Sequence, residues 1–491
     1  MTTSPIRDIH QPEVSTSAQK PHRLLPWLTL LIGLVCFFWA LGDIALLSFN
    51  EARRAIPTLG MFTTGDWLLP RINGELYITK PPLLYWLTTT TSHLLGSVSN
   101  WSLRLPLALA AAAVVFAAYR HALRRFGPWA ALFTAQLLIA NASFSNFARR
   151  VEIDMLLTAL CFGALLAALH YIQEQAGRRW ILLSYFLFGL AVLTKGPVPL
   201  LFVTLPLVAY ALLYRDKRAW RVLLDPVGWV ILLLVGSSWF LAVSLQMGTD
   251  IWQDTVQRDI FDKVHGTSSG WLLSYFVWML VDFLPASLLL LAAPLATWRR
   301  WKSDTRLTAL IIAVAVPLLI FTISSDRHAK YLLPAYPLIA LIAGKRLGEL
   351  METARPMWQR LLPVLGLLLP LGYATYYAVG EARVYNYRTA GLLQFEQWIA
   401  EVRDTPVYGY VALDERSIYY AKRTIPMLNR EEVEQKRAEQ SSFLLLVESN
   451  QSGAADQTAD CKVREFEPYL KRKKTLTVLG FGAACLPPAT P

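Results

Sequence analysis

Residues Asn50–Pro82 read NEARRAIPTLGMFTTGDWLLPRINGELYITKPP and contain seven charged side chains directly after an apolar run. That run, Trp27–Ser48, is long enough to cross a bilayer. Charges at a membrane boundary are costly unless they pair with each other or meet a ligand. The stretch therefore predicts a functional site at the end of the first membrane span.

The composition predicts an α-helical polytopic membrane protein. Of the 491 residues, 54% are hydrophobic, and the mean hydropathy is +0.37. Such values exclude an ordinary soluble protein. Apolar runs predict about eleven transmembrane helices, at Trp27–Ser48, Leu103–Leu123, Trp129–Phe147, Met155–Gln173, Trp180–Thr194, Val198–Tyr214, Val227–Leu245, Trp271–Ala296, Leu307–Ile323, Tyr331–Ala343 and Leu361–Val379.

Basic residues fall in every second connection between these spans, namely at Arg124/Arg125, Arg178/Arg179, Arg215–Arg221, Arg299–Lys302 and Lys345/Arg346. The alternation follows the positive-inside rule and predicts that these loops and the N-terminus are cytoplasmic. It also accounts for the net charge of +12 without a nucleic-acid partner. The apolar segment Leu83–Leu95 is interpreted as an interfacial or re-entrant helix, because counting it as a span would place the basic loops outside.

The predicted domain organisation has three parts. Residues 1–24 are polar, show no signal-peptide cleavage site, and are interpreted as a disordered cytoplasmic leader. Residues 25–380 form the transmembrane domain, with a first periplasmic loop at 50–102. Residues 381–491 are predicted to form a small periplasmic α/β domain.

The tail supports that last prediction through short apolar runs that alternate with polar helical stretches. Strands are expected at Val407–Val411, Phe443–Val447 and Thr475–Leu479, and a helix at Arg430–Gln440. Cys461 and Cys485 would lie in an oxidising compartment, so a disulfide between them is predicted. Cys36 and Cys161 lie in spans and are interpreted as inert core residues.

Five outer connections each carry at least one cation, most of them with acids nearby. Singly, these residues also fit membrane anchors, helix ends or local pairs such as Asp154 with Arg150. Together, cations at one membrane level fit an anionic lipid phosphate, and carboxylates among them fit proton transfer. The set comprises Glu51, Arg53, Lys80, Arg149, Arg150, Glu152, Asp154, Lys195, Arg258, Asp259, Lys263, His265, Asp326, Arg327, His328, Lys330 and Tyr331.

Seven short motifs carry a resemblance to a known family. In chain order they are Asn50–Arg53, Thr64–Arg71, Lys80–Trp86, Arg104-Leu-Pro, Asp154-Met-Leu-Leu-Thr, Leu193-Thr-Lys-Gly and Lys330-Tyr-Leu-Leu-Pro. Over roughly residues 25–345, their order resembles the polyprenyl-phosphate-sugar glycosyltransferases of the GT-C fold. This family includes the bacterial aminoarabinose transferases that act on lipid A and the protein O-mannosyltransferases.

The resemblance implies transfer of a sugar from undecaprenyl phosphate to a periplasmic acceptor, in the bacterial inner membrane. Lys80 matches the carrier-phosphate lysine of the family, Arg53 the arginine of its first motif, and Asp154 a second acidic residue of the cavity. The residues expected at the donor phosphate are Arg53, Lys80, Arg149, Arg150, Lys195, Arg258, Lys330 and Tyr331. The residues expected at the reacting centre are Asn50, Glu51 and Asp154.

One position departs from the family pattern. The first motif normally begins Asp-Glu, whereas this chain has Asn50-Glu51, and an amide cannot serve as a general base. Glu51 or Asp154 could supply the carboxylate. Asp43 could reach the cavity if the first span continues as a helix, although a buried acid paired with a cation is the favoured interpretation of Asp43. Alternatively the acceptor is already ionised, as a lipid A phosphate is, and needs little help from a base.

Other functions remain as alternatives. A lipid A or lipopolysaccharide-like acceptor is favoured over a protein or another glycan. A lipid-linked-sugar transporter should have polar residues at midplane and repeated halves, whereas the charges here gather at the outer rim. A structural or assembly partner without catalytic activity is a further alternative, and the replacement of the usual Asp by Asn50 is its main support. No metal-ligand pattern is evident, so no metal or other cofactor is expected to be required; the sugar and the oligomeric state remain open.

Overall fold

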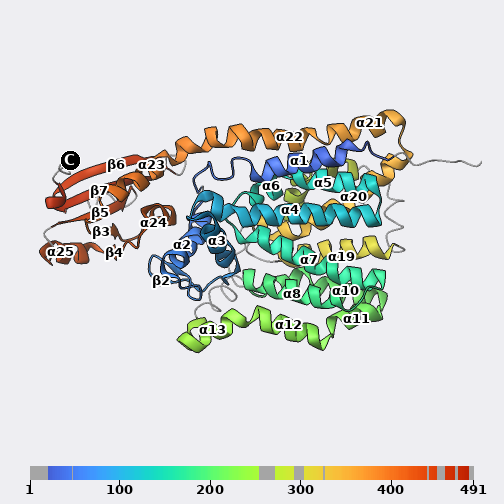
Figure 1. Ribbon diagram of the computed structural model, residues 1–491, viewed down its shortest axis with the longest axis horizontal. Helices are drawn as coiled ribbons and strands as arrows, with labels where there is room; N and C mark the ends of the chain where they lie inside the picture. Colours follow the sequence, from blue (N-terminus) through green and yellow to red (C-terminus); the bar gives the residue numbers. More distant parts are fainter. Residues whose placement is uncertain are drawn as a thin grey trace, which may run out of the picture.

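The computed structural model describes residues 20–46, 48–253, 271, 273–291, 304–323, 327–439, 442–449, 459–469 and 474–485. Within these residues, long and short helices run side by side along the long axis of the molecule (Figure 1). The helices of this bundle are α1 (Leu24–Phe38), α4 (Asn100–Arg125), α5 (Pro128–Ala140), α6 (Ala142–Ala148), α7 (Ile153–Glu174), α8 (Arg179–Lys195), α9 (Pro199–Phe202), α10 (Thr204–Tyr214), α11 (Lys217–Leu223), α12 (Pro226–Gly236), α13 (Ser238–Met247), α16 (Ser274–Asp282), α17 (Ala286–Leu291), α19 (Thr305–Ile323), α20 (Tyr336–Thr353), α21 (Pro356–Leu365) and α22 (Leu368–Thr375).

The bundle is that of a helical membrane protein. Among the described residues, five segments are long and apolar enough to cross a bilayer: Asn100–Arg125, Ile153–Glu174, Lys217–Gly236, Thr305–Ile323 and Pro356–Asn386. Shorter apolar helices lie at Leu24–Phe38, Pro128–Ala140, Pro199–Tyr214 and Ser238–Met247. The helical membrane fold is therefore confirmed, and the number of eleven crossings stays a prediction.

Four of the basic connections, at Arg124/Arg125, Arg178/Arg179, Arg215–Arg221 and Lys345/Arg346, lie at the end of the bundle opposite the described site segments (Figure 1). The fifth, Arg299–Lys302, lies outside the described residues. Helix α8 runs from Arg179 at one end to Lys195 at the other, and α7 runs in the opposite direction from Ile153 to Glu174. We call the end that carries helices α2 and α3 the α2 end, and the opposite end the basic end. This segregation is the arrangement that the charge alternation predicts, whereas the side of the membrane that each end faces stays a prediction.

The first predicted span ends earlier than expected. Helix α1 stops at Phe38, and residues 39–46 form an irregular segment before α2 (Phe49–Thr64) begins. Two arginines bind the carbonyl groups of this region: Arg149 donates to Cys36, Trp39 and Ala40, and Arg104 donates to Leu41, Ile44 and Ala45. The prediction of a helix through Ser48 is wrong because these guanidinium groups satisfy the carbonyls that a longer helix would have used.

The early end of α1 also changes the place of Asp43. Its side chain is exposed, and its backbone carbonyl accepts a hydrogen bond from Asn386 at 3.3 Å. The interpretation of Asp43 as a buried, paired acid is therefore wrong. Because no helix continues past Phe38, the heptad spacing from Asp43 to Asn50 does not place these two residues on one helix face.

Several other predicted spans are interrupted, for example at Val203, Ser237 and Gly366, and two further cases show the cause. The span predicted at Trp129–Phe147 breaks at Asn141, whose side chain caps α6 by accepting a hydrogen bond from Phe144 N at 2.8 Å. The span predicted from Tyr331 begins as the 3₁₀ segment η4 (Ala329–Ala335), and α20 starts only at Tyr336. A further 3₁₀ turn, η1, covers Asp250–Trp252. Local capping and Pro334, which lies within η4, account for the breaks at Asn141 and Tyr331.

The first outer loop folds as a compact unit at the α2 end (Figure 1). It contains α2, a hairpin of β1 (Arg71–Ile72) and β2 (Glu75–Leu76), and α3 (Leu83–Leu95), so the helix predicted at Leu83–Leu95 is confirmed with the same bounds. The Ser48 side chain caps α2. The hairpin turns through Asn73 and Gly74, both with positive φ (53° and 89°), as tight hairpin turns require.

The C-terminal part forms an α/β unit beside α2 and α3 (Figure 1). Its five strands have the order β4-β3-β5-β7-β6, with β3 parallel to β4 and β5, and β7 antiparallel to β5 and β6. Cys461 is bonded to Cys485, with their Cα atoms 5.8 Å apart. The elements are η5 (a π-helical turn, Tyr376–Gly380), α23 (Glu381–Glu401), β3 (Val407–Tyr410), α24 (Glu415–Ala421), β4 (Met427–Leu428), α25 (Arg430–Glu439), β5 (Ser442–Glu448), β6 (Cys461–Tyr469), β7 (Lys474–Gly482) and η6 (Ala483–Cys485).

The orientation of the two ends can be tested by labelling with a membrane-impermeant thiol reagent in intact spheroplasts. We expect Glu75→Cys, on the hairpin, to be labelled and Arg178→Cys, at the start of α8, to be protected, because the positive-inside rule places the basic end in the cytoplasm. The native background should be low, since Cys36 and Cys161 are buried and Cys461 is bonded to Cys485. Labelling at 178 with protection at 75 would contradict this orientation.

Candidate active site

A buried carboxylate, Glu51, organises the first part of the site. Its side chain is fully buried, and Oε1 accepts hydrogen bonds from Arg104 Nη2 and from the Val151 backbone N–H, each at 3.2 Å. Its other oxygen, Oε2, accepts from Arg150 Nη1 at 3.4 Å. Because both oxygens are held by cations or the backbone, this geometry favours a role in fixing α2 over a role in proton transfer.

A second carboxylate, Glu381, joins the same network from the start of α23. It is buried and lies 3.5 Å from Arg149 Nε and 3.4 Å from Arg150 Nη2. Arg149 is itself buried, stacks over the Tyr377 ring at 4.6 Å, and binds the carbonyls at the end of α1 described above. The structure thus places Arg149 and Arg150, which the sequence predicts at the donor phosphate, in contacts within the protein.

Asp154 and Lys195 form a second pair at the α2 end. Asp154 lies in the first turn of α7, is buried, and accepts a hydrogen bond from Lys195 Nζ at 2.6 Å. The Tyr331 ring lies 5.0 Å from Lys195 Nζ, within cation–π distance. Three residues predicted at the site from three separate motifs are therefore in contact.

Lys330 and Glu152 form a third pair close to the second. Lys330 Nζ donates to Glu152 Oε2 at 2.9 Å, and η4, which carries Lys330, packs on α7. Burial raises the pKa of Glu152, although the Lys330 charge opposes this shift. The Lys330 and Lys195 side chains are 26% and 15% exposed, against 3% for Arg149. These two lysines are therefore better placed than Arg149 to meet a ligand.

Lys80 belongs to a neighbouring polar cluster between α2 and α3. Arg54 Nη1 donates to the hydroxyl groups of Tyr77 at 2.7 Å and Tyr85 at 3.2 Å. Burial raises the pKa of Tyr77, but the charges of Arg54 and Lys80 help to lower it below its usual value. Lys80 Nζ is half-buried and donates to the Thr79 carbonyl at 3.0 Å. Helix α3 contacts α8, so Lys80 and Lys195 lie at the same end of the bundle.

The remaining predicted residues lie elsewhere or outside the described residues. Arg53 donates to Glu415 on α24 at 3.0 Å and so faces the C-terminal unit. Asn50 is partly buried next to Glu51. Arg258, together with Asp259, Lys263, His265 and Asp326, lies outside the described residues. Three buried residues were missed as site residues: Arg54, Arg104 and Glu381. The sequence contains a signal for two of these residues: Arg54 follows Arg53 directly, and Arg104 begins the Arg104-Leu-Pro motif. No sequence motif pointed to Glu381.

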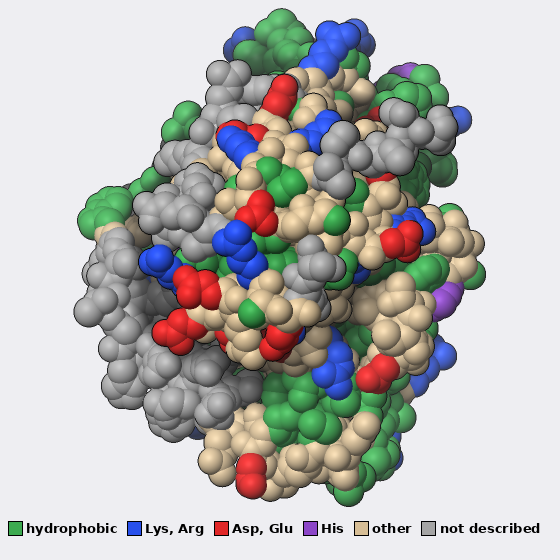
Figure 2. Space-filling view, turned by 90° about the vertical axis from the view of Figure 1, so that its left-hand side faces the viewer, with side chains coloured by type: hydrophobic (Ala, Val, Ile, Leu, Met, Phe, Trp, Pro, Cys, Tyr) green, Lys and Arg blue, Asp and Glu red, His purple; other side chains and the backbone are tan. Residues whose placement is uncertain are grey.

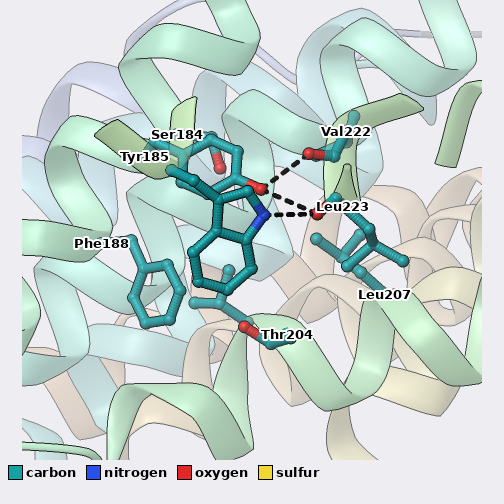
Figure 3. A pocket seen from close by; sticks show the side chains of 9 residues that line it. Ser184, Tyr185, Phe188, Thr204, Leu207, Val222 and Leu223 are labelled. Atoms are coloured by element: carbon teal, nitrogen blue, oxygen red, sulfur yellow. Dashed lines mark hydrogen bonds between the residues drawn. The ribbon is translucent and has the colours of Figure 1, made fainter. Parts of the chain in front are cut away.

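The charged surface and a cavity lie in different parts of the molecule. Figure 2 views the molecule from the side of the C-terminal α/β unit, and on this face Lys or Arg and Asp or Glu side chains are interspersed across the middle. A small, mostly apolar cavity lies instead toward the basic end, between α8, α10, α11 and α12 (Figure 3). There the Tyr185 hydroxyl donates to the Val222 and Leu223 carbonyls at 2.9 and 3.1 Å. This cavity holds none of the ionic pairs, so it is not the candidate site.

Metal binding has no support from the part of the chain that the structure describes. Among those residues, no group of three or more His, Cys, Asp or Glu side chains could hold a metal ion. The expectation that no metal is required stays a prediction.

The role of Glu51 can be tested by thermal unfolding of purified protein in detergent. Glu51→Gln should destabilise the fold by roughly 3–5 kcal/mol, because Arg104 and Arg150 would remain buried without their shared carboxylate. The matched control Glu434→Gln removes an exposed carboxylate 3.7 Å from Arg430 and should change stability by less than about 0.5 kcal/mol. A Glu51→Gln variant with the stability of the parent would contradict the structural role.

Sequence comparisons place this chain beside membrane glycosyltransferases. The family model described as dolichyl-phosphate-mannose-protein mannosyltransferase matches residues 79–245. The undecaprenyl phosphate-alpha-4-amino-4-deoxy-L-arabinose arabinosyl transferase of Aeromonas salmonicida is 28% identical over 344 residues, 67% of this chain and 61% of that relative. The protein of the same description from Pectobacterium atrosepticum is 25% identical over 389 residues, 74% of this chain and 68% of that relative. The chain thus matches about three-fifths of the length of the first of these relatives.

Solved structures show the same architecture. ArnT from Cupriavidus metallidurans bound to undecaprenyl phosphate superposes with a TM-score of 0.74 at 21% identity, over 95% of this chain and 99% of that chain. The oligosaccharyltransferase of Archaeoglobus fulgidus superposes with a TM-score of 0.57 at 13% identity, over 83% of this chain and 65% of that chain. The resemblance read from the motifs is confirmed: this chain has the fold of the GT-C polyprenyl-phosphate-sugar glycosyltransferases.

Proposed function

We propose that this chain is an integral-membrane glycosyltransferase that moves a sugar from undecaprenyl phosphate to an acceptor at the periplasmic surface of the inner membrane. The observation that carries the proposal is the group of Asp154, Lys195, Tyr331, Glu152 and Lys330 at the α2 end, in contact with each other from three separate motifs. In ArnT, the same fold binds undecaprenyl phosphate. Partly exposed lysines beside a buried carboxylate suit a phosphate-linked sugar.

Lysines would act on the donor. In the transfer, the bond between the sugar carbon and the carrier phosphate oxygen breaks, and the phosphate keeps the electron pair. The phosphate therefore gains charge in the transition state, and positioned cations stabilise this charge more than they stabilise the bound donor. Lys80, Lys195 and Lys330 are proposed for this role, because Lys195 and Lys330 keep part of their side chains exposed whereas Arg149 is buried. Tyr331 would hold Lys195 in place through its ring.

Asp154 is the carboxylate proposed at the acceptor side. Glu51 is held by Arg104 and Arg150, and the Asn50 amide cannot take a proton. Asp154 Oδ1 already accepts a hydrogen bond from Lys195 Nζ at 2.6 Å. A carboxylate engaged in this way fits an acceptor that is already ionised, such as a phosphate of lipid A, more than it fits a neutral hydroxyl group that must lose a proton. This argument, together with the names of the relatives, favours a lipid A-like acceptor and requires no metal.

A protein acceptor is the second candidate. It is favoured by the match of residues 79–245 to the dolichyl-phosphate-mannose-protein mannosyltransferase model. The alternative without transferase activity is a lipid-linked-sugar transporter.

Purified protein should be incubated with undecaprenyl phosphate carrying 4-amino-4-deoxy-L-arabinose and with either lipid A or a Ser/Thr-rich peptide. Mass spectrometry should show the sugar on lipid A. Transfer to the peptide instead would select the second candidate, and movement of donor across vesicles without transfer would select the transporter.

The same assay separates the roles of Lys80 and Asp154. Lys80→Ala should weaken donor binding and also slow turnover. Lys80→Arg should restore only part of the lost activity, because a planar guanidinium group replaces the compact ammonium charge. Asp154→Asn should cut turnover by about 10²–10⁴-fold and largely keep donor affinity, because the acceptor side loses its carboxylate and Lys195 loses its charged partner. Normal transfer by both Lys80→Ala and Asp154→Asn would rule out this site.

Asn50→Asp distinguishes two explanations of the departure from the family pattern. A rise in activity would mean that the usual carboxylate is simply absent here. No change, or a loss, would mean that the surrounding network is adjusted to the amide.

A further inference from the structure

The first outer loop and the C-terminal unit are joined by directed polar contacts. Asn73, at the tip of the β1–β2 hairpin, donates from Nδ2 to the Ile425 carbonyl and accepts at Oδ1 from the Ile425 N–H, both at 2.7 Å. The Leu46 N–H donates to the Tyr420 hydroxyl at 2.8 Å. Arg53 donates to Glu415 at 3.0 Å. We call these three contacts the latch.

The Asn73 contact depends on the identity of that residue. Asparagine tolerates the positive φ of the turn, and its amide offers one donor and one acceptor to the two backbone groups of Ile425. Aspartate would present only acceptors and would face the Ile425 carbonyl with an oxygen. Glycine would keep the backbone conformation and lose both hydrogen bonds.

Buried apolar side chains of α2 and of the C-terminal unit also pack against each other beneath the latch. Ala52, Ala55 and Ile56 of α2 belong to the same buried cluster as Tyr419 and Ile425 of the C-terminal unit. Helix α2 therefore has one face in the core of this unit. The same helix carries Glu51, bound to the arginines, and Arg54, bound to Tyr77.

We propose that the C-terminal unit is needed to shape the site. Asn73, Arg53 and Glu415 are positioning residues that fix the hairpin and α2. Fixing these two elements holds Arg54, Tyr77 and Lys80 in place. Arg53 then acts through Glu415 and does not bind the donor phosphate. Lys80 follows the hairpin by four residues, and Tyr77 by one, so a shift of the hairpin tip moves both. The activity readout for this inference rests on the proposed function.

Charge exchange between Arg53 and Glu415 tests the inference. Arg53→Glu and Glu415→Arg should each lower sugar transfer about fivefold, because an attraction between partly exposed charges becomes a repulsion. The double variant Arg53→Glu/Glu415→Arg should return most of the activity. If Arg53 binds the donor phosphate, the double variant will be as inactive as Arg53→Glu, and that result would overturn the proposal.

Asn73 gives an independent test of the same latch. Asn73→Gly should lower transfer about tenfold, since the Ile425 N–H and carbonyl lose their partners, and Asn73→Asp should be at least as impaired. The matched control Arg430→Glu reverses an exposed charge on α25 whose pair, Glu434, is exposed too, and should retain parental activity. Parental activity in both Asn73 variants would contradict the proposal.

Hydrogen exchange provides a readout that needs no enzyme activity. Exchange of segment 71–80 should become faster in Glu415→Arg and Asn73→Gly and return toward the parental rate in Arg53→Glu/Glu415→Arg. If the parent transfers no sugar but these exchange changes occur, the proposed function fails while the latch stands. If exchange in segment 71–80 is unchanged in all variants, the latch fails regardless of activity.

Discussion

The buried Glu51 carboxylate is the interaction on which the rest of the α2 end depends. It binds Arg104 of α4 and Arg150 of the α6–α7 connection, and Arg150 in turn binds Glu381 of α23. Segments more than 300 residues apart in the chain are thereby held in one place. Isolated charges in such a setting would be very costly, so each member of the network fixes the position of the others.

The charges of this network do not balance. Arg104, Arg149 and Arg150 carry three positive charges, and Glu51 and Glu381 carry two negative ones, so one positive charge is in excess. Part of this excess is met by carbonyl groups: Arg149 binds those of Cys36 and Trp39 at the end of α1, and Arg104 binds those of Leu41 and Ile44 in the segment that follows. In the family pattern an Asp stands where this chain has Asn50, so the α2 end of this chain has one carboxylate fewer than that pattern would give it.

Sequence reasoning located many of the apolar helices, because hydropathy is a local signal. The motifs singled out Asp154, Lys195, Lys330 and Tyr331 for the candidate site, and the structure brings these residues together. The α3 helix was predicted with its observed bounds from its apolar run, and in the structure Gly96 ends it. In contrast, the end of α1 at Phe38 has no local signal. It follows from Arg104 and Arg149, which reach it from distant parts of the chain.

Contacts between distant parts of the chain also explain why the partners of the arginines could not be predicted from the sequence. Arg53, Arg149 and Arg150 look alike in the sequence, since each stands in an outer connection beside an acid. Their partners are Glu415, Glu381 and the carbonyls after α1, which no spacing rule connects to them. Arginine can satisfy several carbonyl and carboxylate oxygens at once, which suits it to buried structural links. Lysine concentrates its charge at one atom on a flexible stem, and the lysines at 195 and 330 keep part of that charge accessible. The different surroundings of the buried Arg149 and of the partly exposed lysines therefore agree with the side-chain chemistry of the two residue types.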